Sequence, residues 1–276
     1  MFMSHWDFFS KDQLESGETL IHPMAVVSKG ATLGKGVKIG PFAVVGEKVK
    51  LDDGVQVGCG AVLGGDLSIG KDTVIFPYAT VGSLPQDLKY KGEDSRIIIG
   101  ERNRIREYVN ISLGTSDGGM LTRIGDDNLL MCYTHVAHDC NMGSSCIVAN
   151  GVQFAGHVTI GNRVVLGGLA AVHQFCTIGD LAMIAGGAMV TQDVFPFSMV
   201  QGDRATLRGL NVVGIRRSQY KKVSDIKKMY SLVFKQELAL DEAVLQIKEQ
   251  VEDGEEKSIV LAFLEQSIRA GRGLVR

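Results

Sequence analysis

The stretch from residue 21 to residue 81 reads IHPMAVVSKGATLGKGVKIGPFAVVGEKVKLDDGVQVGCGAVLGGDLSIGKDTVIFPYATV. An aliphatic residue returns at every sixth position without a miss: Ile21, Val27, Leu33, Ile39, Val45, Leu51, Val57, Leu63, Ile69, Ile75 and Val81. A helix repeats every 3.6 residues and an amphipathic strand every two, so neither produces a strict period of six. The stretch is therefore a hexapeptide repeat.

The residues around each aliphatic position predict a triangular prism. The residue two places before it is mostly small, as at Ala25 and Ala43, and the residue after it is often glycine, as at Gly34 and Gly40. Each hexad is expected to form a short strand and a turn, with three hexads closing one coil of about 18 residues around an aliphatic interior. Coils stack as parallel strands about 4.8 Å apart, so residues one coil apart should lie one above another.

Two interruptions break the repeat. The six-residue period stops after Val81 and resumes at Ile99. A second break over 112–123 shifts the phase by one residue, and the repeat then continues from Ile124 to Val190. We expect insertions near 82–98 and 112–123 to leave the prism as surface loops that build a binding face. Because residue 99 lies 18 positions after residue 81, the first insertion is interpreted as replacing one whole coil.

The pattern divides the chain into three segments. Residues 1–20 are an N-terminal extension, 21–195 form the prism, and 196–276 form a C-terminal α-helical domain that begins where Pro196 closes the repeat. Apolar residues recur at helical spacing within 216–236, 240–251 and 259–268. The segment 216–236, which we call the basic segment, carries seven lysines and arginines against one acid.

Composition limits the function classes. The chain has 276 residues, is 45% hydrophobic and carries a formal net charge of −2, which argues against a general nucleic-acid binder. The first 20 residues lack a signal-peptide pattern, and no apolar run reaches the roughly 18 residues that span a bilayer, so we expect a cytoplasmic protein. The five cysteines include no CxxC pair, so neither a zinc site nor a disulfide framework is predicted from them.

Three of the six histidines follow the coil spacing. His138, His157 and His173 lie within two positions of an 18-residue ladder, which predicts one strip on the prism surface. An imidazole can accept a proton from an alcohol at neutral pH, so His138 is a candidate general base, and Asp139 beside it could fix its tautomer. Two other interpretations stay open: ordinary exposed turn histidines, or a metal site that includes His135 and His138. No G-x-S-x-G motif is present, so direct attack by a substrate hydroxyl is the simpler scheme.

Several strings resemble the acyl-[acyl-carrier-protein]–UDP-N-acetylglucosamine O-acyltransferases: QDLKY (86–90), RNRIRE (102–107), DNLLM (127–131), HVAHDC (135–140), AGHV (155–158), AVHQFC (171–176), QGDRAT (201–206), GLNVVGIRR (209–217) and RGLVR (272–276). The resemblance covers about residues 21–276. It implies a left-handed parallel β-helix that assembles as a homotrimer with active sites between subunits. It also implies transfer of a 3-hydroxyacyl chain from acyl carrier protein to the 3-hydroxyl of UDP-N-acetylglucosamine, the first step of lipid A biosynthesis, without a cofactor or a metal.

The resemblance also implies roles for single residues. His138 matches the general base, Asp139 its supporting carboxylate, and Gly156 the backbone donor to the thioester oxyanion. The implied substrate-binding positions are Gln86, Asp87, Lys89, His135, His157, His173, Gln174, Asn211, Arg216 and Arg217, the last three at the nucleotide and phosphate end. Lys89 and the basic segment are expected to attract the acidic acyl carrier protein.

Two positions depart from the family's pattern. Leu113 stands where arginine is common and Val213 where some members have a carboxylate, which leaves a 3-amino sugar open as the acceptor.

The sequence is also compatible with a hexapeptide acetyltransferase that uses acetyl-CoA, with N-acylation by a related pathway enzyme, and with a structural β-helix that has no activity. Gly168, Gly186 and Gly187 leave room along the prism and favour a long acyl chain.

Overall fold

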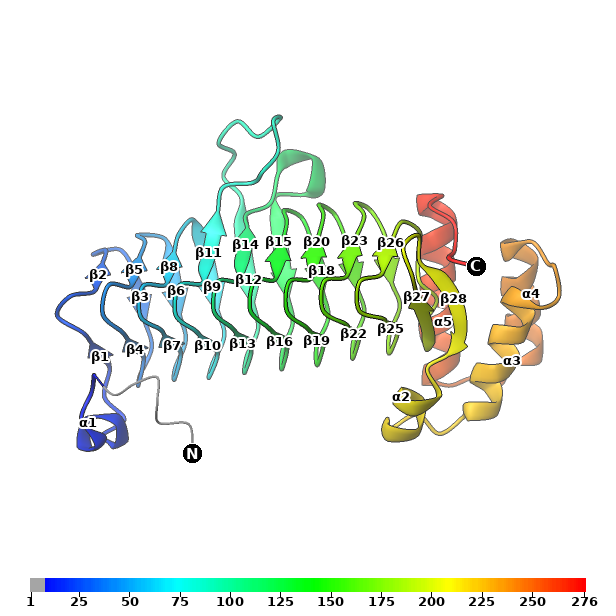
Figure 1. The fold of residues 1–276 in the computed structure, drawn as a ribbon, viewed down its shortest axis with the longest axis horizontal. Coiled ribbons are helices and arrows are strands. Elements are labelled where there is room, and N and C mark those ends of the chain that lie inside the picture. The colour runs from blue at the N-terminus through cyan, green and yellow to red at the C-terminus, as the bar shows by residue number, and fades with distance from the viewer. Residues whose placement is uncertain (1–7) are drawn as a thin grey trace.

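The computed structural model describes residues 8–276, which form a long prism with helices at one end (Figure 1). The predicted left-handed parallel β-helix with a C-terminal helical region is confirmed. Three sheets of 11, 9 and 8 strands make the three faces of the prism. His5 and the rest of residues 1–7 lie outside the described part of the chain.

From β1 to β26, each face collects every third strand, and β27 and β28 extend the first face. The first face contains β1 (Leu20–Ile21), β4 (Lys38–Ile39), β7 (Gln56–Val57), β10 (Val74–Ile75), β13 (Arg104–Ile105), β16 (Leu129–Leu130), β19 (Ile147–Val148), β22 (Val165–Leu166), β25 (Met183–Ile184), β27 (Ser198–Gln201) and β28 (Thr206–Leu210). The second contains β2 (Val26–Val27), β5 (Val44–Val45), β8 (Val62–Leu63), β11 (Thr80–Ser83), β14 (Asn110–Ser112), β17 (His135–Val136), β20 (Gln153–Phe154), β23 (Ala171–Val172) and β26 (Met189–Val190). The third contains β3 (Thr32–Leu33), β6 (Val49–Leu51), β9 (Asp66–Ile69), β12 (Arg96–Ile99), β15 (Leu121–Ile124), β18 (Asn141–Met142), β21 (Thr159–Ile160) and β24 (Thr177–Ile178).

The aliphatic ladder builds the core. Ile39 pairs with Val57 and Val57 with Ile75, and all three side chains are fully buried. At the first coil, which has no coil beneath it, Ile21 is still 45% exposed. The large and small inward positions thus fill the prism wherever a coil is stacked on both sides.

A polar ladder runs through the same interior. The buried Asn128 accepts a hydrogen bond from the Cys146 N–H (2.8 Å) and donates one to the Gly143 carbonyl (3.0 Å). Asn103, one coil earlier, accepts from the Asn128 N–H (2.9 Å). These amides satisfy backbone groups that would otherwise be buried without partners.

The first insertion does not replace a coil, so that prediction is wrong. Ile99 pairs with Ile69, and Ile111 pairs with Val81, so each partner follows at 30 residues instead of 18. The extra residues all lie between β11 and β12. An insertion of any multiple of six residues keeps the hexad phase, and phase alone therefore cannot tell a lengthened coil from a replaced one.

Both insertions leave at one edge of the prism. The second lies between β14 and β15, carries the short 3-10 helix η1 (Ser116–Gly118), and sets Ile124 against Ile99. In Figure 1 the two loops project from the same side, at the edge where the second face meets the third. We call this edge the loop edge.

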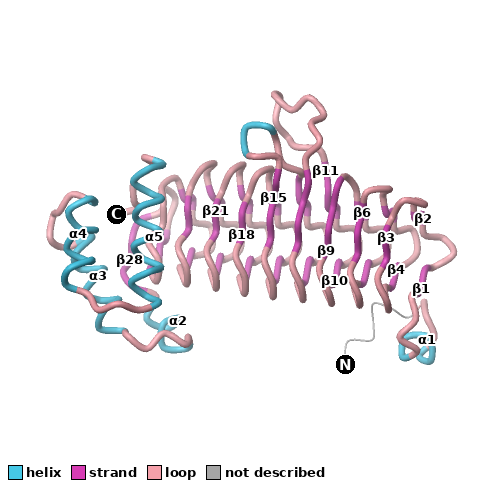
Figure 2. The backbone as a smooth tube through the Cα atoms, turned by 180° about the vertical axis from the view of Figure 1, so that it is seen from behind, coloured by secondary structure: helices cyan, strands magenta, loops and turns pink. Residues whose placement is uncertain are grey.

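The C-terminal region covers one end of the prism. Its helices are α2 (Val212–Arg217), α3 (Val223–Phe234), α4 (Leu240–Gln250) and α5 (Glu255–Ala270), and the predicted apolar residues of α3, Ile226, Met229, Leu232 and Val233, are buried. The first face continues past residue 195, because β27 pairs in parallel with β25 and β28 pairs antiparallel with β27. Figure 2 shows α5 beside the last coil, with α3 and α4 farther out.

The opposite end carries α1 (Lys11–Glu15), which begins with a capping box between Ser10 and Gln13. This helix falls within the segment expected as an N-terminal extension. Among residues 8–276, no helix is long and apolar enough to cross a membrane.

Candidate active site

The candidate histidines lie in successive turns at the loop edge. His138 and Asp139 follow β17, Gly156 and His157 follow β20, and His173 and Gln174 follow β23. The ring centroids of His138 and His157 are 5.0 Å apart, which agrees with the coil spacing. Asp139, His157 and Phe175 hold φ values of 60°, 63° and 66°, so the same left-handed turn recurs in each coil and stacks these side chains.

His138 and Asp139 form a hydrogen-bonded pair. Nδ1 of His138 lies 2.9 Å from Oδ2 of Asp139, whose side chain is fully buried, while the His138 side chain is 12% exposed. A carboxylate only accepts hydrogen bonds, so Nδ1 carries the proton and the lone pair of the neutral ring is on Nε2. The pair therefore presents a base with a fixed tautomer.

The second insertion supplies further partners of Asp139. The Asp139 carboxylate accepts hydrogen bonds from the Thr115 N–H (2.9 and 3.1 Å) and from the Thr115 hydroxyl (2.6 Å). The Asp139 N–H donates to Thr122 Oγ1 (2.9 Å). The sequence pattern did not point to either threonine. The glycines around them were the available signal, since a β-carbon at Gly118 would overlap the Asp139 side chain.

Gly156 lies against the His138 ring. A β-carbon at residue 156 would be 2.7 Å from Nε2 of His138, which is closer than real contacts allow. Within residues 8–276, the Gly156 N–H donates to no other group. The Gly156 N–H, a backbone hydrogen-bond donor, thus lies next to the candidate base His138.

His157 and His135, both partly buried, lie beside the pair. His157 stacks on Phe175 with ring centroids 4.4 Å apart, and its Nδ1 is 3.9 Å from Oδ2 of Asp139. Burial lowers the pKa of His157 below its ordinary value, and the Asp139 charge offsets part of that shift. Burial, together with the charge of His138, also lowers the pKa of His135, which shares a 2.8 Å hydrogen bond with Asn110.

The last turn of the strip meets the C-terminal tail. His173 and Gln174 are exposed, and a guanidinium nitrogen of Arg272 contacts Nδ1 of His173. The tail is held by hydrogen bonds from Asp193 N–H to Gly273 O and from Val275 N–H to Asp193 O, both 2.9 Å. Arg272 was not predicted, because its place beside the histidine strip depends on how the tail folds back.

The first insertion brings Gln86, Asp87 and Lys89 to the same edge. Asp87 accepts a hydrogen bond from the Lys89 N–H (2.9 Å), and Nζ of Lys89 lies 3.3 Å from Asp117 of the other loop. The charges of Asp87 and Asp117 both act to raise the pKa of His157, against the larger effect of burial. Gln86 and Lys89 are exposed.

Three expected residues lie elsewhere. Asn211 caps α2 by accepting from the Gly214 N–H (2.9 Å) and donates to the Leu181 carbonyl (2.9 Å), while Arg216 and Arg217 are exposed at the end of α2. In Figure 1, α2 and the two loops lie on opposite sides of the molecule. A single chain therefore does not bring these three residues to the histidines.

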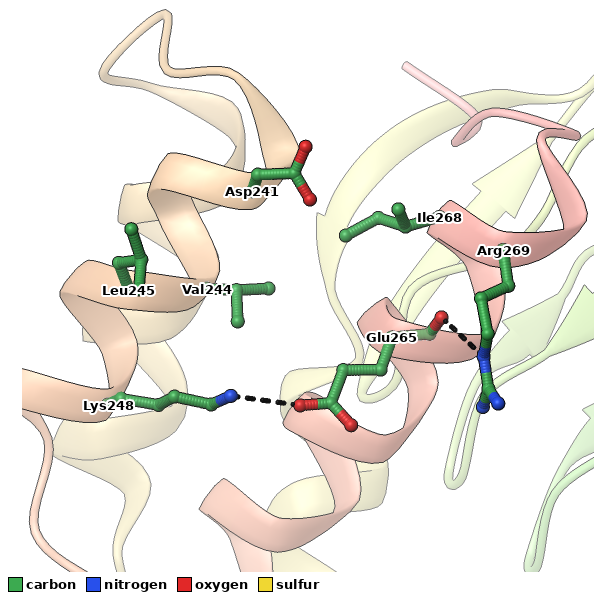
Figure 3. A pocket seen from close by; sticks show the side chains of 7 residues that line it. All are labelled: Asp241, Val244, Leu245, Lys248, Glu265, Ile268 and Arg269. Carbon is green, nitrogen blue, oxygen red and sulfur yellow. Dashed lines mark hydrogen bonds and ion pairs between the residues drawn. The ribbon is translucent and has the colours of Figure 1, made fainter.

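Two cavities lie away from the histidine strip. One of about 550 Å³ between α4 and α5 is lined by residues that include Val244, Leu245 and Ile268, and Lys248 and Glu265 form a 3.0 Å ion pair across it (Figure 3). The other, about 560 Å³, lies on the first face beside Arg102 and Arg104. Neither contains a candidate residue.

One group of side chains in the described part of the chain could hold a metal ion. His138, Asp139 and His157 each offer a ligand atom, and these atoms lie within 4.8 Å of one another. Imidazole and carboxylate ligands suit several transition metals. The same Nδ1 and Oδ2 atoms already face each other as a hydrogen-bonded pair.

Comparisons with known proteins find a matching family model and similar chains. A family model described as Udp N-acetylglucosamine O-acyltransferase, Domain 2, matches residues 193–275. The acyl-[acyl-carrier-protein]–UDP-N-acetylglucosamine O-acyltransferase of Aliarcobacter butzleri is 55% identical over 197 residues, 71% of this chain and 76% of that one. The enzyme of the same name from Verminephrobacter eiseniae is 50% identical over 225 residues, 81% of this chain and 86% of that one.

Solved structures extend the likeness to nearly the whole fold. The UDP-N-acetylglucosamine O-acyltransferase of Moraxella catarrhalis matches with a TM-score of 0.89 at 38% identity, covering 93% of this chain and 99% of that one. The UDP-N-acetylglucosamine acyltransferase of Campylobacter jejuni matches with a TM-score of 0.86 at 38% identity and the same coverage.

Proposed function

The chain belongs to the acyl-[acyl-carrier-protein]–UDP-N-acetylglucosamine O-acyltransferase family, and from this membership we propose its reaction. It transfers a 3-hydroxyacyl chain from acyl carrier protein to the 3-hydroxyl of UDP-N-acetylglucosamine, the first step of lipid A biosynthesis. The proposal rests on the His138–Asp139 pair, 2.9 Å apart, and on the neighbouring Gly156 N–H, which has no partner within residues 8–276.

The proposed chemistry begins at Nε2 of His138. This nitrogen takes the proton of the sugar 3-hydroxyl as its oxygen attacks the thioester carbonyl, and Asp139 stabilises the imidazolium that forms. The Gly156 N–H donates to the oxyanion of the tetrahedral intermediate. The intermediate then collapses, the carbon–sulfur bond breaks, and His138 returns the proton to the leaving thiolate.

A transfer assay with 3-hydroxyacyl carrier proteins tests this scheme. We expect His138→Ala to reduce turnover by about a hundredfold or more, the usual scale for losing a general base. His22→Ala is the matched control, because His22 lies in the first coil, away from the cluster, and should leave turnover unchanged. Full activity of His138→Ala would refute the role of His138.

The metal-ligand geometry of His138, Asp139 and His157 supports a second candidate, metal-assisted transfer. In that scheme a bound ion would polarise the thioester carbonyl. Chelation followed by assay separates the two schemes. Loss of turnover on chelation and its return with added zinc would favour the metal, whereas chelator-resistant turnover favours the base alone.

We propose a homotrimer with active sites between subunits. The separation of Asn211, Arg216 and Arg217 from the histidine strip supports this, because a neighbouring subunit could bring them together. The edge between the first and second faces supports it too: Tyr78, Tyr108 and Tyr133 are exposed there, with ring centroids 5.4 and 5.0 Å apart. Sedimentation should give three times the 29.8 kDa chain mass. Mixed oligomers of His138→Ala and Arg216→Ala should regain part of the activity if the site is shared.

We propose that acyl carrier protein docks at the C-terminal helices. In the basic segment, Lys222 pairs with Glu252 (3.3 Å) and Lys228 donates to the Gln250 carbonyl (2.6 Å), whereas the exposed Lys221 and Lys227 form no ion pair within residues 8–276. Exposed cations of this kind attract an acidic partner and raise its encounter rate. We propose that the protein lies in the cytoplasm, where it would meet acyl carrier protein.

A further inference from the structure

The second insertion lies directly on the Asp139 carboxylate. Both donors of Thr115, its N–H and its hydroxyl, point at this carboxylate from 2.6 to 3.1 Å. Thr115 is itself buried, as is Thr122, which accepts the Asp139 N–H from the other end of the insertion. The loop therefore holds both the main chain and the side chain of Asp139.

This contact decides which way the carboxylate faces. Oδ2 of Asp139 is the atom that binds His138, and it also lies 3.9 Å from Nδ1 of His157. A carboxylate rotating freely about its Cβ–Cγ bond could turn toward either ring. The Thr115 hydroxyl bonds to the same Oδ2 while its N–H reaches both oxygens, and together they fix the rotation that favours His138.

Two glycines allow this approach. Added β-carbons at Gly114 and Gly118 would both crowd the Asp139 side chain. Neither glycine has a positive φ, so close approach is the reason a side chain is excluded there. Asp139 itself holds φ at 60°, an unfavourable value for a residue with a β-carbon, and the hydrogen bond to Thr122 helps to maintain that turn.

We propose that Thr115 is a positioning residue for the reaction, and that the second insertion serves to aim Asp139 at His138. This inference rests on the proposed function, in which His138 is the base. Thr115 does not touch the reacting atoms. It acts by holding the Asp139–His138 pair in the geometry from which proton transfer starts.

Thr115→Val tests the hydroxyl alone, because valine keeps the shape and the backbone N–H. We expect kcat to fall by roughly 10- to 100-fold, the scale for one lost hydrogen bond to a charged group, with little change in KM. Thr115→Ser restores the hydroxyl and should recover most of kcat. Thr73→Val is the control, because Thr73 is equally buried and donates to a carbonyl (3.0 Å) two coils before that of Asp139.

A double-mutant cycle with Asp139→Ala separates positioning from general stability. If Thr115 acts through Asp139, adding Thr115→Val to Asp139→Ala should cause no further loss of kcat. Additive losses, or full kcat in Thr115→Val, would overturn the proposal. Gly118→Ala should reproduce the Thr115→Val defect by pushing the loop away from Asp139.

An NMR readout keeps this test independent of the reaction. In the wild type the His138 Nδ1–H bonded to Asp139 should give a low-field proton resonance, which Thr115→Val should broaden or shift and Thr115→Ser should retain. An unchanged resonance in Thr115→Val would refute the positioning role. If the resonance responds as expected while His138→Ala keeps full activity, the proposed function fails and the positioning of Asp139 stands.

Discussion

The backbone of Gly156 packs against the imidazole of His138 so closely that a β-carbon would come within 2.7 Å of Nε2. Gly156→Ala should therefore displace the ring and lower kcat by about a hundredfold, because small misplacements of a base have such effects. Steady-state kinetics measures the change. Gly64→Ala is the matched control, since the nearest atom to its β-carbon, the Gly82 carbonyl oxygen, lies at 3.6 Å. Equal activity in both variants would contradict the packing argument.

His157 should make stability depend on pH in the mildly acidic range. Burial lowers its pKa in the folded state below the ordinary value of 6.5, so folding favours the neutral ring. The resulting stabilisation is fully present above pH 6.5 and is lost as pH falls through the folded-state pKa. Thermal unfolding should show a smaller loss of Tm between pH 7.5 and 5 in His157→Gln than in the wild type. An NMR titration placing the His157 pKa above 6.5 would contradict this expectation.

Charge reversal at Lys221 should weaken acyl carrier protein docking. This side chain is exposed in the basic segment, so Lys221→Glu should raise the apparent KM for the carrier by roughly threefold to tenfold at low salt. The difference should shrink as ionic strength rises. Lys29→Glu makes the same charge change on an exposed lysine at the other end of the prism and serves as the control. A carrier KM independent of salt would count against the docking surface.

The interior amide ladder should contribute to stability rather than to catalysis. Asn128→Ala leaves the Cys146 N–H and the Gly143 carbonyl without partners inside the prism, at a cost of about 2–4 kcal/mol in the free energy of unfolding. Urea denaturation measures this change. Asn162→Ala removes a similar bond to the Ser144 N–H (2.9 Å), but Asn162 is exposed and water can replace it. Equal losses in the two variants would show that burial is not the cause.

The hexad pattern predicted the three faces and the core because a period of six specifies which side chains point inward. The same pattern could not show whether the first insertion lengthens a coil or replaces one. The length of the insertion is a multiple of six, so Ile99 returns in phase and pairs with Ile69. It also missed the continuation of the first face into β27, where Met199 and Val200 pair with the preceding coil outside the repeat. Pairing partners in that region depend on how the chain leaves the prism.

The histidine strip was predictable because coil stacking converts sequence spacing into distance. His138 and His157, 5.0 Å apart, follow that rule. Thr115 and Arg272 do not, because a loop and a folded-back tail bring them to the strip. Asn211 was expected at the nucleotide, and in this structure its amide also caps α2. An asparagine directly before a helical pattern is a cap signal that the sequence did contain.

The stacking of each coil on the one before it also localises cooperativity. In such an array each repeat gains most of its stability from its nearest neighbours, so fraying that starts at the first coil need not spread. Asp139, His157 and Phe175 follow three adjacent strands of the second face, and the C-terminal helices protect the coil end nearest to them. Opening of the N-terminal coils, where Ile21 is already 45% exposed, would then leave the reactive turns folded, with amide exchange fastest at that end and slowest around His138.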